Sequence, residues 1–98
     1  MPPRLIVRKR AHSDIDSACA WYESQERGVG LQFLDEVDAA LRLVRERPEL
    51  FAILKGRVRR AILNKFPFGI YYVHSGNAVS VISVVHVARH PSTWPQRG

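Results

Sequence analysis

The amino-acid sequence predicts an α+β domain in the order β-α-α-β-β-β, with a helix hairpin packed on an antiparallel sheet. Apolar residues recur at helical spacing through two adjacent segments of the first half. The second half is instead rich in β-branched residues, interrupted by turn residues. A length of 98 residues corresponds to one domain, residues 1–98.

A short strand and a first helix are expected at the start of the chain. The strand covers residues 4–9 (RLIVRK). Ser13 is the expected N-cap of the helix, because Asp16 follows it in the position of a capping box, and the carboxylates of Asp14 and Asp16 suit the positive end of the helix. The residues that share one face of this helix are Ile15, Ala18, Cys19 and Tyr22. Trp21 and Tyr22 are therefore expected to pack between the helix and the sheet.

The second helix is expected to run antiparallel to the first, since only a short break containing glycines (RGVG) separates them. It extends from about Leu31 to Arg47 and is ended by Pro48. Its apolar stripe consists of Leu34, Val37, Leu41 and Val44. Charged residues fall largely on the opposite side, which is typical of a helix that buries one face.

Strands are expected again after a loop that covers residues 48–56. These strands are residues 57–66, 70–74 and 78–88, separated by a turn at 67–69 (PFG) and a turn at 75–77 (SGN). The last strand is the longest and is apolar on both faces. Such a pattern is typical of a central strand that helices cover on at least one side.

The charges are divided unequally along the chain, whose formal net charge is +6. Residues 1–50 hold all nine acidic residues and eight Lys or Arg, which gives 8 − 9 = −1. Residues 51–98 hold seven Lys or Arg and no acidic residue, which gives +7. A polyanion or an acidic protein is the expected partner of such a surface.

The sequence favours a cytoplasmic protein that does not cross a membrane. Cys19 is the only cysteine, so no internal disulfide forms, and a reducing compartment fits this composition. The apolar run in MPPRLIVRKR is too short for a signal peptide or a membrane span.

Four short motifs follow one another in a characteristic order. The first is Ala18-x-x-Trp21-Tyr22-Glu23, and the second is Gly30-x-x-Phe33. The third is Phe66-Pro67-Phe68, and the last is His86-x-x-Arg89-x-Pro91-x-x-Trp94. In this combination, over almost the whole chain, the sequence resembles the RelE/ParE superfamily of bacterial toxins from type II toxin–antitoxin modules.

The resemblance implies a toxin that inhibits growth and is neutralised by a cognate antitoxin in a hetero-oligomeric complex. Such antitoxins usually wrap an amphipathic tail around the toxin and bind operator DNA with their other end, so the toxin contacts DNA only through the antitoxin. No cofactor is implied. ParE-like members bind and poison DNA gyrase, whereas RelE-like members cleave mRNA on the ribosome.

Gyrase poisoning is the favoured activity, and a ribosome-dependent mRNA endoribonuclease is the alternative. A ribonuclease needs acid–base groups and cations for the phosphate, and the candidates are His86, Arg89, His90 and Arg59. Several RelE-type nucleases use a tyrosine near the C-terminus, but none follows Tyr72 here. Others use a carboxylate base, and the second half contains none. The histidines keep the nuclease hypothesis open.

Basic and aromatic residues of the second half are the candidates for binding a partner: Arg57, Arg59, Arg60, Lys65, Arg89 and Trp94. Alternation along a strand would place Arg57, Arg59 and Lys65 on one face and Arg60 on the other. Arg57, Arg59 and Arg60 could equally be solvated charges on an edge strand. His86 could be a hydrogen-bonded histidine at the edge of the core. No metal site is expected, since no carboxylate or cysteine lies near His86 and His90 in the sequence.

Overall fold

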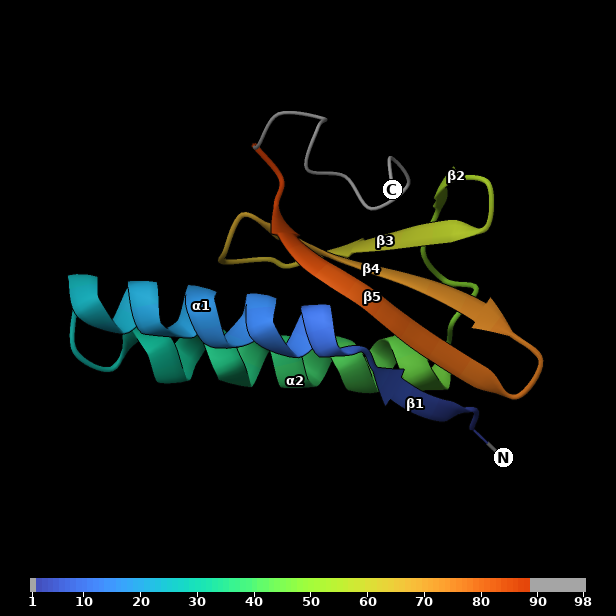
Figure 1. The fold of residues 1–98 in the computed structure, drawn as a ribbon, viewed down its shortest axis with the longest axis horizontal. Helices are drawn as coiled ribbons and strands as arrows, with labels where there is room; N and C mark the ends of the chain where they lie inside the picture. The colour runs from blue at the N-terminus through green and yellow to red at the C-terminus, as the bar shows by residue number, and fades with distance from the viewer. Residues whose placement is uncertain (1, 89–98) are drawn as a thin grey trace.

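A five-stranded sheet with two helices on one of its faces forms the computed structural model, which describes residues 2–88 (Figure 1). The elements in chain order are β1 (Arg4–Val7), α1 (Lys9–Gln25), α2 (Val29–Glu46), β2 (Ile53–Lys55), β3 (Val58–Ile62), β4 (Phe68–Ser75) and β5 (Ala78–His86). The predicted α+β class and the helix hairpin are confirmed.

The sheet is mixed rather than antiparallel, with the strand order β1-β5-β4-β3-β2. β3, β4 and β5 pair antiparallel through hairpin connections, as predicted, and β2 pairs antiparallel with β3. β1, however, pairs parallel with β5, from Arg4 opposite Ala78 to Val7 opposite Val81. The predicted antiparallel sheet is therefore corrected at β1 alone, since the other described pairs are antiparallel. After β1, the helix hairpin takes the chain to the opposite edge of the sheet, where β2 lies. β3, β4 and β5 then follow in order across the sheet, so that β5 lies beside β1.

Several strand boundaries differ from the sequence prediction. β2 lies inside the segment predicted as a loop, where it pairs with β3 at the edge of the sheet. β3 ends at Ile62 instead of residue 66, and β4 begins at Phe68 instead of residue 70. The predicted turn at 67–69 lies earlier, because the N–H of Leu63 donates to Phe68 O at 2.9 Å and closes the turn there. The turn before β5 is confirmed, with Gly76 at a φ of 58°.

α1 begins four residues before the predicted N-cap. Its N-cap position is Arg8, without a side-chain capping bond, so Ser13 and Asp16 lie inside the helix. The earlier start places Ala11 on the buried face of α1, where it is fully buried in the core. α2 runs from Val29 to Glu46, within two residues of the prediction.

Aromatic rings fill the core between the hairpin and the sheet. Tyr22 and Phe33 from the helices meet Phe66 and Phe68 from the sheet side, with ring centroids from 4.8 to 6.1 Å apart. Leu34, predicted to lie on the buried stripe of α2, is 36% exposed, whereas its neighbour Phe33 is fully buried.

The two helices approach closely at Gly30, in the second of the sequence motifs. A Cβ atom on Gly30 would lie 2.8 Å from the carbonyl oxygen of Cys19, so any larger residue would force neighbouring atoms to move. The thiol of Cys19, which is partly buried, donates to the carbonyl oxygen of Gly30 at 3.5 Å. The carboxylate of Glu23 accepts the N–H groups of Gly28 and Gly30, so α1 caps the start of α2.

Candidate functional site

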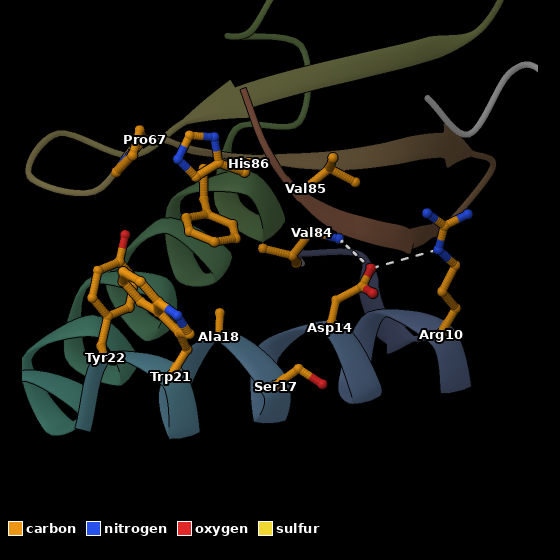
Figure 2. Close-up of a pocket in the computed structure, with 11 residues that line it drawn as sticks. Arg10, Asp14, Ser17, Ala18, Trp21, Tyr22, Pro67, Val84, Val85 and His86 are labelled. Atoms are coloured by element: carbon orange, nitrogen blue, oxygen red, sulfur yellow. Dashed lines mark hydrogen bonds and ion pairs between the residues drawn. The ribbon is translucent and has the colours of Figure 1, made fainter. Parts of the chain in front are cut away.

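A groove of about 860 Å³ runs between α1 and the ends of β4 and β5 (Figure 2). The helix lines it with Arg10, Asp14, Ser17, Ala18, Trp21 and Tyr22. The strand side supplies Pro67, Phe68, Val84, Val85 and His86. Its floor is apolar, since Ala18, Phe68 and Val84 belong to the buried core. The volume is large enough for several side chains of a protein partner.

Trp21 stands at one end of the groove, with 58% of its surface exposed. Its ring meets the edge of Tyr22 with 5.1 Å between the centroids. The prediction that Trp21 packs between helix and sheet was therefore wrong, because its position on α1 turns it toward the groove (Figure 2). An exposed tryptophan beside an apolar floor is typical of a protein-binding surface.

His86 lies at the strand end of the same groove. Its imidazole meets the ring of Phe68 edge-on, with 5.2 Å between the centroids. Its Nδ1 accepts the N–H of Ala88 at 3.1 Å. The side chain is thus held by hydrogen bonding and packing at the edge of the core, as one of the two interpretations of this residue predicted.

Asp14 bridges the helix and the sheet across the groove. Its Oδ2 accepts the N–H of Val84 at 2.9 Å and lies 3.6 Å from the Nε of Arg10 (Figure 2). Sequence reasoning assigned Asp14 only to the start of the helix. The sequence does hold a sign of this contact, because Asp14 directly precedes the buried Ile15. Its carboxylate therefore lies at the border of the apolar face of α1.

The candidate catalytic residues do not converge in the described part of the chain. His86 pairs with Phe68, and Arg59 pairs with Tyr72, so their partners on β4 lie four residues, or roughly 13 Å, apart. The guanidinium of Arg59 donates to Phe51 O at 2.7 Å. Arg89 and His90, the other two candidates, lie outside the described residues.

The candidate partner-binding residues are distributed over the far part of the sheet. Arg59 and Arg60 are adjacent on β3, and their side chains point to opposite faces, as predicted. Arg57 precedes β3 and Lys65 follows it, so these two do not continue one strand face, contrary to the prediction. Both are exposed. Arg89 and Trp94 lie outside the described residues.

One carboxylate of α2, that of Glu36, holds the turn that leads into the groove. The N–H of Lys65 donates to the Oε2 of Glu36 at 3.0 Å, and the N–H of Asn64 donates to the same oxygen. This clamp fixes the segment before Pro67 and Phe68, which line the groove. Glu36 therefore positions one wall of the groove from the far helix.

Two tyrosines have raised pKa values because they are buried. Burial raises the pKa of Tyr72 to about 12, and the nearby charge of Arg59 opposes this in part. The hydroxyl of Tyr72 donates to Pro48 O at 2.6 Å and so ties the end of the helix hairpin to β4. Burial also raises the pKa of Tyr22.

Neither a metal cluster nor a membrane helix is present among residues 2–88. No three histidine, cysteine, aspartate or glutamate side chains in this range gather closely enough to hold a metal ion. Neither α1 nor α2 has the length and hydropathy that a membrane span requires.

Comparison with known proteins identifies the fold. No family model matches the chain, and no curated protein matches it. Among solved structures, it is similar to a chain described as "Chromosomal ParDE TA system from P. aeruginosa". The TM-score is 0.78 at 16% identity, over 87% of this chain and 96% of that chain. The likeness confirms the fold that the resemblance to the RelE/ParE superfamily implied.

Proposed function

We propose that this protein is the toxin of a type II toxin–antitoxin module, which inhibits growth by binding and poisoning DNA gyrase. The observation that carries the proposal is the likeness in fold, over 87% of the chain, to a protein of a ParDE TA system. The sequence motifs that resemble the RelE/ParE superfamily support it independently. A gyrase poison would act in the cytoplasm.

The separation of His86 and Arg59, the two candidate catalytic residues in the described part of the chain, favours binding over RNA cleavage. General acid–base catalysis requires groups within hydrogen-bonding reach of one substrate. His86 and Arg59 are separated along the sheet by roughly 13 Å, and Arg59 is bonded to a backbone carbonyl. Within residues 2–88, His86 packs against the ring of Phe68 in a groove whose floor is apolar. These features suit a toxin that acts by contact with a protein.

A cognate antitoxin would neutralise the toxin by covering the groove and the basic strands. The groove offers an apolar floor, and β3 with its flanking residues adds the positive charge of Arg57, Arg59, Arg60 and Lys65. An amphipathic antitoxin segment with acidic residues would match both surfaces. Operator DNA would be contacted only through the antitoxin.

Induced expression of the chain alone tests the proposed activity. DNA synthesis and protein synthesis are followed side by side by pulse labelling, and purified protein is added to gyrase to measure trapped cleavage complexes. Early loss of DNA synthesis together with trapped complexes is the expected result. Early loss of translation with cleaved mRNA would favour the ribonuclease instead.

Substitution of the groove histidine separates the two activities further. His86→Gln should leave toxicity largely intact if the toxin acts by binding, because glutamine keeps the polar contact and most of the volume. His74→Gln, on β4 and away from the groove, is the matched control. Loss of toxicity in His86→Gln alone, with an unchanged unfolding transition, would argue for catalysis.

A further inference from the structure

The edge of the sheet at β2 is open (Figure 1). β2 is the last strand in the order β1-β5-β4-β3-β2, so within residues 2–88 no strand lies on the side away from β3. Two large apolar side chains are exposed here, Ile53 of β2 with 54% of its surface and Leu50 shortly before it with 50%. An open strand edge that carries apolar side chains is a template for pairing with another chain.

The backbone groups of Ile53 are directed away from the sheet. Ile53 lies opposite Arg59 of β3. The N–H of Arg60 donates to Ala52 O at 3.3 Å, so Ala52 faces β3. The alternation within an antiparallel pair then turns the N–H and the C=O of Ile53 toward the open edge. Two antiparallel copies with Ile53 opposite Ile53 would exchange both hydrogen bonds across a two-fold axis.

The charges on either side of β2 favour this register. A two-fold axis at Ile53 brings Glu49, four residues before it, beside Arg57 of the second copy, four residues after it. Both side chains are exposed, and the symmetry forms the pair twice. The same axis keeps the two Lys55 side chains four residues, or roughly 13 Å, apart along the edge. An axis at Lys55 would instead set lysine against lysine, which disfavours that register.

We propose that two copies of this chain pair through β2, antiparallel and centred on Ile53, as a symmetric dimer. The two five-stranded sheets then join edge to edge into one continuous sheet. Because the two-fold axis of an antiparallel pair is perpendicular to the sheet, both helix hairpins lie on the same face of it. The groove takes no residue from β2 and remains open in each copy.

The contact is small, so the dimer is weak. β2 has three residues, whereas stable interfaces bury about 1,200–2,000 Å². We therefore expect a dissociation constant of about 10 µM to 1 mM. The dimer is a state of the free chain, because Arg57 also belongs to the basic surface assigned to the antitoxin above. The inference itself does not rest on the proposed function, since only the geometry and charges of the β2 edge carry it.

Sedimentation velocity of the purified full chain tests whether the dimer forms. Between about 10 µM and 1 mM, the mean mass should rise from that of a monomer toward that of a dimer. NMR spectra over the same concentrations should show shifts of the amide signals of Ile53 and Lys55 and slower hydrogen exchange of the Ile53 N–H. A chain that stays monomeric throughout, or a dimer whose shifts lie on β5 or α2 instead, would overturn the proposal.

Ile53→Pro removes the N–H that the second copy needs. Proline is tolerated on an edge strand where its nitrogen faces away from the sheet, so the variant should keep its thermal unfolding midpoint and remain monomeric at the highest concentration. Ile53→Val retains the N–H and most of the apolar surface, and its dissociation constant should stay within about threefold of that of the unaltered chain. Undiminished association of a folded Ile53→Pro would show that the strands do not pair.

Exchange of the charges at the two ends of β2 tests the register without altering the strand. Arg57→Glu and Glu49→Arg each set like charges against one another in both pairs, so each should weaken the dimer by about tenfold. The double variant restores opposite charges and should recover the original dissociation constant to within about threefold. Arg27→Glu, at an exposed position in the turn between the helices, matches the charge change of Arg57→Glu and should have little effect. Losses that add in the double variant would refute the register.

Discussion

A methyl group placed on Gly30 would test how closely α1 and α2 are packed. In Gly30→Ala, the new Cβ would lie 2.8 Å from the carbonyl oxygen of Cys19 and 2.9 Å from the Oε1 of Glu23. The carbonyl belongs to the backbone of α1, so it can move only if the helices separate. Glu23 can move, but it then loses its hydrogen bonds to Gly28 and Gly30.

Effects of opposite sign determine how much Gly30→Ala changes the free energy of unfolding. Overpacking in a close contact costs about 1–3 kcal/mol, and a weakened charge-assisted hydrogen bond adds to this. Alanine is a better helix former than glycine by about 1 kcal/mol, which offsets part of the loss. We expect Gly30→Ala to lower the free energy of unfolding by roughly 1–3 kcal/mol, and the midpoint of thermal unfolding by about 5–15 °C.

Urea unfolding followed by circular dichroism measures the effect. Ala39→Gly, at an exposed position of α2, is the control that reports helix propensity without a contact between helices. It should cost about 1 kcal/mol. If Gly30→Ala instead raised stability by a similar amount, propensity alone would govern the site, and the inferred close approach of the helices would be refuted.

The other predictions concern the core and the clamps around the groove. The folded-state pKa of Tyr72 is raised from 10.0 to about 12. The hydroxyl of Tyr72 therefore adds its full contribution to the free energy of unfolding below pH 10, and this contribution is lost as the pH rises through about 12. Urea unfolding measured across this pH range should show a decrease in the free energy of unfolding on the order of 2 kcal/mol. The same decrease should be absent in Tyr72→Phe. Glu36→Ala should lower stability by about 1 kcal/mol, while Asp35→Ala, its exposed neighbour, should change it by less than about 0.5 kcal/mol in the same unfolding assay. Phe33→Ala should cost about 3–5 kcal/mol, and Leu34→Ala much less, because only Phe33 is fully buried; equal losses would contradict the assignment of the buried stripe.

Local sequence patterns predicted the helices and most strands because each element carries its own periodicity. The stripe containing Val37 and Val44 is buried as expected, and Gly76 forms the expected turn before β5. The boundaries were less predictable where packing outweighs local preference. α1 begins earlier than predicted and so includes the buried Ala11. β2 forms where the chain pairs with the edge of β3.

The groove could be predicted only in part. His86 was singled out from its place at the end of an apolar strand, and it lines the groove. Trp21 was assigned to the core, because helical spacing alone does not tell which side of a helix faces the sheet and which faces the groove. Asp14 was assigned to the helix start, because its contact with Val84 joins residues 70 positions apart in the sequence.

The sequence by itself determined the α+β class, the helix hairpin and the division of charge, because periodicity, glycine and proline positions and composition are local properties. Only the tertiary structure decided that β1 pairs parallel with β5 and ends at Val7, halfway along it. That pairing leaves the later part of β5 open beside α1 and brings Asp14 to Val84. The physical reason is that strand pairing depends on how distant segments pack around a shared core, and no local pattern specifies that arrangement.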